Sequence, residues 1–386
     1  MIYYLSELFK DINFPGHGLF QYLSFRALAA VVLSMLIAFF AGKKIIGWLQ
    51  RKQIGETVRD LGLEGQMQKK GTPTMGGIII LLSLVGSVLL ICDLSNIYVQ
   101  MLLVTTVWCG GIGFADDYIK VFKHNKEGMS PRMKLILQFT LALGIALIFC
   151  FSHTIWGDGA KQLVTTIPFV KANEFDYSWL SPFKGQLGMY FSWAVYVAMI
   201  IIVVLACSNG TNLTDGLDGL ASGTSAIVGV ALGVLAYVGG NINNADYLNI
   251  MYLRGSGEVA VFMAAFAGAL VGFLWYNTFP AQVFMGDTGS LAIGGIIGVS
   301  AVLIRKELLL PLLCGIFLVE SASVLIQKYW FKYTRIKYGE GRRIFLMAPL
   351  HHHYQKQGIP EPRIVSRFWI IGIILAVATL ALLKIR

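Results

Sequence analysis

The chain has few charged residues. Asp, Glu, Lys and Arg make up 13% of its 386 residues, whereas hydrophobic residues make up 56%, and the mean hydropathy is +0.67. A soluble domain carries about 25% charged residues, so this composition excludes a soluble protein and a separate soluble domain. Apolar runs long enough to cross the roughly 30 Å hydrocarbon core recur, and helices must satisfy the backbone there. We expect an all-α, polytopic integral membrane protein.

Other features are missing as well. The five cysteines show no CxxC spacing and are odd in number, so we read them as packing residues. Residues 1–21 contain no basic region leading into an apolar one, so we expect no cleavable signal and a first span that is retained. The net charge of +10 lies mainly in loops, where topology and anionic membrane lipids explain it, so no nucleic-acid partner is expected.

The apolar runs predict about ten transmembrane helices. Segments 42–74, 116–134 and 328–367 hold 21 of the 31 Lys and Arg residues and should therefore be cytoplasmic. An even number of spans then places both termini on the periplasmic side, with 153–188 and 239–257. The predicted spans lie near 22–41, 75–92, 98–115, 133–152, 189–207, 219–238, 258–277, 289–304, 308–328 and 367–384.

The sequence predicts one transmembrane domain over residues 1–386, because no stretch suggests a second folding unit. The polar motifs all fall in its cytoplasmic connections. These connections are expected near 42–74, 116–132, 208–218, 278–288 and 329–366.

Five aspartates gather at this face: Asp116 with Asp117, Asp215 with Asp218, and Asp287. Carboxylates at the edge of a membrane span are costly to dehydrate, so we expect them to serve a metal, a phosphate or an ion. Adjacent helical residues diverge by about 100°, so Asp116 and Asp117 need different roles. An exposed helix end with salt bridges is the alternative, but the helix macrodipole opposes it.

Polar residues recur every third position through Asn209, Asn212, Asp215 and Asp218, which indicates a polar ladder at a cavity rim. Asp287 stands between glycines, where a helix N-cap is the simpler interpretation. The segment 69–77 combines lysines, glycines and hydroxyls without forming a Walker motif, and alone it favours a cytoplasmic anchor followed by a close-packed helix start.

A histidine triplet, His351, His352 and His353, follows Arg342 and Arg343. Consecutive histidines lack the separated ligand spacing of a zinc site, so contact with phosphate is the better interpretation. Glu320 lies inside a predicted span, where it is expected to be protonated or hydrogen-bonded across a helix interface, and we leave it outside the site.

Five segments together closely resemble the phospho-N-acetylmuramoyl-pentapeptide transferase family, which belongs to the polyprenyl-phosphate N-acetylhexosamine-1-phosphate transferase superfamily. The likeness extends from about residue 20 to the C-terminus, although 153–188 and 239–257 look longer than is usual in the family. The segments are GTPTMGG at 71–77, GFADDYIK at 113–120, NLTDGLDGL at 212–220, FMGDTGS at 284–290 and APLHHHYQ at 348–355.

The resemblance implies transfer of phospho-N-acetylmuramoyl-pentapeptide from UDP-N-acetylmuramoyl-pentapeptide to undecaprenyl phosphate, which gives lipid I and UMP. It also implies Mg²⁺, a homodimer, and a bacterial cytoplasmic (inner) membrane location with the active site facing the cytoplasm. Asp287 would coordinate Mg²⁺, and Asp116 would be the candidate base with Asp117 nearby. The triplet would meet the phosphates. Lys69 and Asp218 would contact uracil, Phe284 would stack on it, and Thr74, Asn212, Asp215 and Asn277 would line the pocket.

Two alternatives remain open from the sequence. A UDP-N-acetylglucosamine-1-phosphate transferase acting on the same lipid would share the metal, nucleotide and lipid sites. A cation-coupled transporter could also hold acids in a helical bundle, but it would place them near the bilayer midplane. Whether transfer is direct or passes through a covalent phosphoryl-enzyme also stays open, because Asp116 could serve either way.

Overall fold

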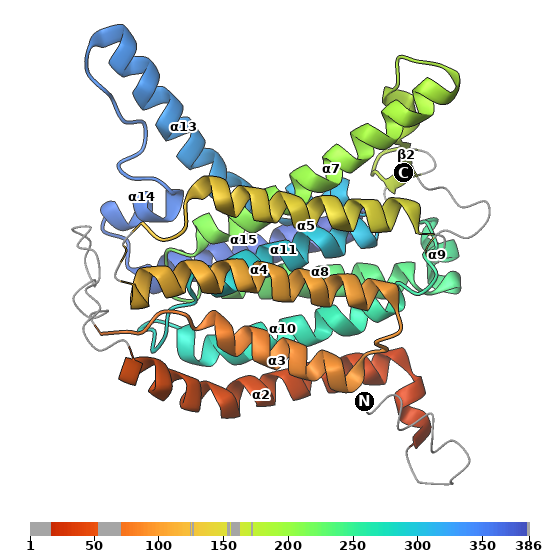
Figure 1. The fold of residues 1–386 in the computed structure, drawn as a ribbon, viewed down its shortest axis with the longest axis horizontal. Helices are drawn as coiled ribbons and strands as arrows, with labels where there is room; N and C mark the ends of the chain where they lie inside the picture. Colours follow the sequence, from red (N-terminus) through yellow and green to blue (C-terminus); the bar gives the residue numbers. More distant parts are fainter. Residues whose placement is uncertain are drawn as a thin grey trace.

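The computed structural model describes residues 17–52, 71–123, 125, 127–152, 155, 163–170 and 173–383, so Lys69 lies outside the described residues. Long helices form one bundle, accompanied by a two-stranded antiparallel sheet (Figure 1). The elements are η1 (His17–Gln21), α2 (Leu23–Lys52), α3 (Gly77–Ile91), α4 (Ile97–Phe122), α5 (Pro131–Phe151), β1 (Val164–Thr166), β2 (Glu174–Asp176), η3 (Tyr177–Leu180), α7 (Gly185–Thr214), α8 (Leu220–Gly239), α9 (Ile242–Leu248), α10 (Gly257–Asn277), α11 (Gly286–Leu303), η4 (Glu307–Leu309), α12 (Leu310–Leu313), α13 (Gly315–Tyr338), α14 (Leu350–Lys356) and α15 (Glu361–Leu382).

The helices lie where the apolar runs predicted them. Within the described part of the chain, eight are long and apolar enough to cross a membrane, and a ninth span arises if Glu307–Leu313 and Gly315–Tyr338, bent by 76°, count as one. The 15-residue α3 is apolar but shorter. The prediction of an all-α polytopic membrane protein is confirmed.

Several helices continue beyond their apolar run. α2 extends to Lys52, α7 to Thr214 and α13 to Tyr338. The predicted connections 42–74, 208–218 and 329–366 therefore begin as helix, because hydropathy marks the hydrocarbon layer whereas helical hydrogen bonding continues into polar residues.

α10 and α11 form the buried centre of the bundle. α10 packs against α2, α3 and α8, while α11 packs against α3, α4 and α7. A Cβ at Gly77 would collide with the backbone of Gly289, and one at Gly113 would collide with the carbonyl of Asp287. Glycine thus lets α3 and α4 approach the backbone of the first turn of α11, as small residues do between membrane helices.

The polar motifs share one end of the bundle, which we call the acidic end. Here α4, α7 and α10 end, and α3 and α11 begin. In Figure 1, α2 begins and α15 ends at the other end, which we call the opposite end. The first and the last long helix thus have their outer ends on the same side of the bundle, which agrees with an even number of spans. The side of the membrane that each end faces stays a prediction.

A compact cap closes the opposite end. The buried Arg305 has its guanidinium carbon 4.8 Å from the ring centre of Phe149 and 4.7 Å from that of Tyr196. Lys306 Nζ donates to Thr166 Oγ1 at 2.5 Å, which ties β1 to the segment after α11. A desolvated cation over aromatic rings contributes about 2 kcal/mol. The insertion between α5 and α7 is therefore fastened to the bundle core.

Candidate active site

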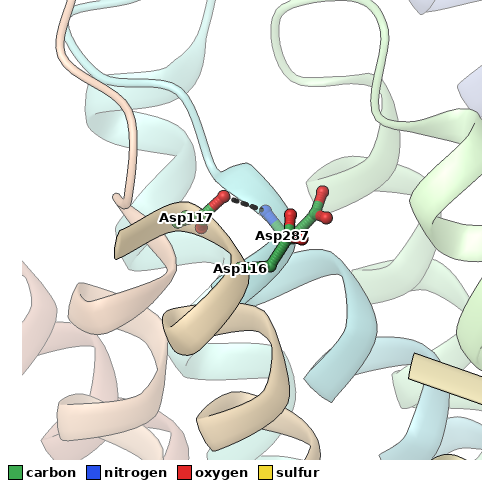
Figure 2. Close-up of side chains that lie close together, drawn as sticks. All are labelled: Asp116, Asp117 and Asp287. Carbon is green, nitrogen blue, oxygen red and sulfur yellow. Dashed lines mark hydrogen bonds between the residues drawn. The ribbon is translucent and has the colours of Figure 1, made fainter. Parts of the chain in front are cut away.

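Three carboxylates meet at the acidic end, contributed by two helices far apart in sequence. Asp116 and Asp117 lie in the C-terminal part of α4, and Asp287 lies in the first turn of α11 (Figure 2). One oxygen from each lies within 4.8 Å of the others. Asp116 is fully buried and Asp117 nearly so. The predicted gathering of these residues is thus present in the structure.

Asp117 caps the N-terminus of α11. Its Oδ1 accepts the backbone N–H of Asp287 at 3.1 Å, the bond drawn in Figure 2. Its Oδ2 accepts the backbone N–H of Thr288 at 2.9 Å and the Thr288 hydroxyl at 2.7 Å. The first N–H groups of a helix have no partner within the helix, and a carboxylate there is favoured by the macrodipole. Asp117 therefore fixes the position of Asp287 from a neighbouring helix.

Gly286, the residue before Asp287, has φ of +72°, a conformation that glycine adopts without strain. A Cβ at this position would lie 2.6 Å from Asp117 Oδ2 and 3.0 Å from Thr74 Oγ1. A glycine is therefore required before Asp287, because α4, the start of α11 and the segment that carries Thr74 approach one another closely here. The same approach places Thr74 beside the cluster.

Two lysines bridge Asp116 and Asp287. Lys120 Nζ lies 2.5 Å from Asp116 Oδ2 and 3.2 Å from Asp287 Oδ2. Lys134 Nζ lies 2.9 Å from Asp116 Oδ1 and 2.6 Å from Asp287 Oδ2. The backbone N–H of Met129 donates to Asp116 Oδ1 at 2.7 Å. Lys134 had no stronger signal in the sequence than a cation at the start of an apolar run.

Asn212 joins the cluster from α7. Its amide Nδ2 donates to Asp287 Oδ1 at 2.9 Å and to Ser290 Oγ at 2.8 Å. With Asp117 at its backbone, Asp287 is therefore held by α4, α5 and α7 together. Such convergence of fixed donors on one side chain is what positions a ligand or catalytic carboxylate.

The donor set suits a hard divalent cation. Its potential ligand atoms are all carboxylate oxygens, the donors that Mg²⁺ prefers. Two ammonium groups already concentrate positive charge between Asp116 and Asp287, so this is the point where the protein accommodates cations. Asp287 is the acid of this cluster whose carboxylate is held by both lysines and by Asn212.

Apart from Lys69 and the histidine triplet, the remaining predicted residues lie in three segments that are hydrogen-bonded together. Asn277 accepts the N–H of Gly219 at 3.1 Å and donates to the carbonyl of Val283 at 3.0 Å. Asp218 Oδ2 accepts the N–H of Ala281 at 3.0 Å. The turn after α7, which contains Asp215, therefore packs against the connection between α10 and α11.

Phe284 belongs to the same arrangement. Its N–H donates to the carbonyl of Pro73 at 2.9 Å, and its carbonyl accepts the N–H of Gly76 at 2.8 Å. The backbone of the 71–77 motif is thus paired with the connection that leads to Asp287. Glu361, which no sequence pattern marked as a site residue, accepts the N–H of Asp218 at 2.7 Å.

The histidine triplet does not present one surface. His351 is buried, and its Nδ1 lies 3.1 Å from Glu320 Oε2. His352 Nδ1 lies 2.8 Å from Gln355 Oε1, and His353 Nδ1 accepts the N–H of Leu346 at 3.1 Å. Successive residues of the short α14 point in different directions. The group of potential metal ligands found among the described residues contains no histidine.

Comparisons with known proteins identify the family. The model of glycosyl transferase family 4 matches residues 99–305, and signature 1 of the phospho-N-acetylmuramoyl-pentapeptide-transferases matches residues 69–81. Proteins of that name from Parabacteroides distasonis, Flavobacterium psychrophilum and Porphyromonas gingivalis are 54%, 52% and 49% identical to the chain, with 100% of both chains covered. The chain belongs to the phospho-N-acetylmuramoyl-pentapeptide transferase family. It is therefore a phosphoglycosyl transferase, in a family that generally depends on a divalent metal.

Family membership and the position of the carboxylates also decide between this activity and the two alternatives left open by the sequence. The signature and the relatives carry the muramoyl-pentapeptide name, which disfavours the UDP-N-acetylglucosamine-1-phosphate transferase. The carboxylates lie where α4 ends and α11 begins, at one end of the bundle. A cation-coupled transporter is expected to hold them at the middle of its helices, so this alternative is disfavoured as well.

Proposed function

We propose that this chain transfers phospho-N-acetylmuramoyl-pentapeptide from UDP-N-acetylmuramoyl-pentapeptide to undecaprenyl phosphate at the acidic end of the bundle. The products are lipid I and UMP, which makes this a step of peptidoglycan synthesis. The supporting observation is that α4 and α11 gather three carboxylates, two of them buried, beside two lysines. One anionic phosphate must attack another, so the site needs both cations and fixed polar groups.

Asp287 would hold Mg²⁺. Its carboxylate is contacted by Asn212 on one oxygen and by both lysines on the other. Bound Mg²⁺ would offset charge on the diphosphate and on the departing UMP. Asp117 would act through Asp287, because both of its oxygens already accept hydrogen bonds from the first turn of α11.

Asp116 is the proposed base for the lipid phosphate. A phosphate oxygen of the lipid forms a bond to the phosphorus that carries the sugar, the bond from that phosphorus to UMP breaks, and the lipid phosphate proton passes to Asp116. Asp116 suits this role because its main partners are the two lysines, whose ammonium groups can follow incoming phosphate oxygens. Lys120 and Lys134 would then donate to the phosphates during transfer.

The nucleotide would lie against the hydrogen-bonded segments beside the cluster. Asp218 would contact uracil, Phe284 would stack on it, and Asn277 would hold the segments in register. His352 and His353, half-buried on α14, are the members of the triplet left to meet the phosphates. Further residues proposed for this pocket are Lys69, Thr74, Asn212 and Asp215.

The acidic end would face the cytoplasm of a bacterial inner membrane. The connections at this end carry most of the Lys and Arg residues, as the positive-inside rule requires. The location suits both reactants, since one is water-soluble and the other has its head group at the interface. A homodimer remains part of the proposal on the strength of the family resemblance alone.

The decisive experiment measures UMP release by purified enzyme from UDP-N-acetylmuramoyl-pentapeptide and undecaprenyl phosphate, with and without Mg²⁺. We expect release that requires both substrates and the cation. Turnover of UDP-N-acetylglucosamine with none of the muramoyl-pentapeptide nucleotide would overturn the substrate assignment. Ion movement across liposomes without any UMP release would overturn the enzymatic assignment.

A further inference from the structure

Glu320 is a fully buried carboxylate in α13, the second part of the bent pair of helices that together count as a candidate membrane span. Charged side chains inside such helices are costly, and those that persist bind a partner or serve a function. The partner here is His351, the second residue of α14. Its ring Nδ1 lies 3.1 Å from Glu320 Oε2, and its backbone N–H donates to Oε1 at 3.2 Å. The Glu320 side chain thus holds both the imidazole of His351 and the start of α14.

The pairing fixes which ring nitrogen of His351 faces which neighbour. A carboxylate can only accept, so Nδ1 carries a proton in the bond to Glu320. A hydrogen bond at one imidazole nitrogen determines the orientation of the other. The remaining nitrogen, Nε2, consequently points away from α13.

Nε2 of His351 faces the turn that follows α7. This nitrogen is buried and lacks a hydrogen-bond partner among the described residues. A Cβ at Gly216 would collide with it, so the ring rests on the glycine backbone. Gly216 stands between Asp215 and Asp218, within the turn assigned above to the nucleotide. Contacts therefore lead from α13 through one imidazole to the backbone of that turn.

We propose that Glu320 is a positioning residue for the nucleotide-binding turn, because it holds the His351 ring as a support beneath Gly216. The proposal rests on the proposed function, which assigns the turn to the nucleotide. Glu320 is fully buried and its carboxylate contacts His351, so it would act on the turn through this imidazole. A pair that only stabilised the fold would affect both substrates alike, whereas a support for this turn affects the nucleotide selectively.

The test is steady-state UMP release, in which each substrate is varied while the other is saturating. We expect Glu320→Ala to raise the KM for the nucleotide about tenfold or more and to leave the KM for undecaprenyl phosphate within about twofold, because a buried charged hydrogen-bond pair is lost. Glu320→Gln keeps an acceptor and should restore the nucleotide KM to within about threefold of the wild type. Ser323→Ala is the matched control, since its buried hydroxyl donates to the Glu320 carbonyl at 2.6 Å and should leave both KM values unchanged.

Gly216→Ala disturbs the same contact from the side of the turn, because its methyl group would collide with the His351 ring, and it leaves α13 unchanged. We expect the same selective rise in nucleotide KM, and less than the sum of the two effects when it is combined with Glu320→Ala. Equal changes in both KM values, unchanged values in Gly216→Ala, or a Gln variant no better than Ala would overturn the positioning role. A wild-type enzyme that releases no UMP would instead overturn the proposed function, and this inference with it.

Discussion

Asp117→Asn removes the charge from the cap of α11 while it changes the shape of the side chain little. Three donors converge on the native carboxylate: the N–H of Asp287, and the N–H and hydroxyl of Thr288. An asparagine offers one oxygen, and its NH₂ group must face at least one of these donors. A lost hydrogen bond to a charged group costs about 1.5–3 kcal/mol, and the lost interaction with the helix terminus about 0.5–1 kcal/mol more.

The lost hydrogen bond destabilises the first turn of α11, which carries Asp287. Residues that orient a metal-binding side chain change metal affinity about 10–100-fold when they are replaced. We therefore expect the Mg²⁺ concentration for half-maximal UMP release to rise by about that factor in Asp117→Asn. The measurement is a Mg²⁺ titration at saturating substrates, with thermal unfolding followed in parallel to verify that the variant is folded.

Thr288→Val is the matched comparison, because it removes only the hydroxyl and keeps both backbone donors on Asp117. The loss of one neutral donor costs about 1 kcal/mol, so its shift in the Mg²⁺ requirement should stay below about tenfold. A folded Asp117→Asn enzyme with a wild-type Mg²⁺ dependence would refute the idea that Asp117 acts by positioning Asp287.

Three further outcomes are expected. Asp287→Asn should lower kcat at least about 100-fold in a UMP-release assay while the amount of folded protein stays close to wild type, since the proposed metal site loses its central ligand; substantial Mg²⁺-dependent turnover would contradict this. Asp116→Asn should lower kcat by about 10²–10⁴ with little change in nucleotide KM, as expected for a lost general base, and a dominant KM effect would indicate binding instead. Arg305→Met should destabilise the fold by about 2 kcal/mol in thermal unfolding without altering kcat per folded enzyme, because the cap lies at the opposite end; a fall in kcat would show that the two ends are coupled.

The fold could be predicted from the sequence because apolar runs report where the chain crosses the hydrocarbon layer. All the predicted spans coincide with helices, including the short α3 and the bent α12 and α13. Helix ends could not be predicted in the same way, since α2 and α13 continue through basic residues that hydropathy assigns to loops. The hairpin of β1 and β2, whose strands have three residues each, was too short for its pattern to be recognised.

The site could be predicted in part. Asp116, Asp117 and Asp287 stood out because acids beside apolar runs are unusual, and the structure brings them together. The different tasks expected of the two adjacent aspartates agree with their different partners, lysines for one and a helix terminus for the other. Lys134 could not be selected, because its role depends on the packing of α5 beside α4, which spacing along the chain does not encode.

The histidine triplet shows the limit of inference from composition. Three consecutive imidazoles suggested one phosphate-binding group, but helical rotation directs His351 inward to Glu320. Glu320 itself was puzzling in the sequence because its partner lies 31 positions away. Phosphate contact by His352 and His353 stays a prediction, as does the role of Lys69, which lies outside the described residues.

Because Lys120 and Lys134 bridge Asp116 and Asp287, the enzyme carries its own counter-ions for the proposed base and for the proposed metal ligand. Small zinc domains unfold when a chelator removes the metal, because metal binding supplies most of their folding free energy. In this enzyme, EDTA should abolish UMP release while the melting temperature of the helical bundle stays unchanged. Added Mg²⁺ should then restore full activity without any refolding step.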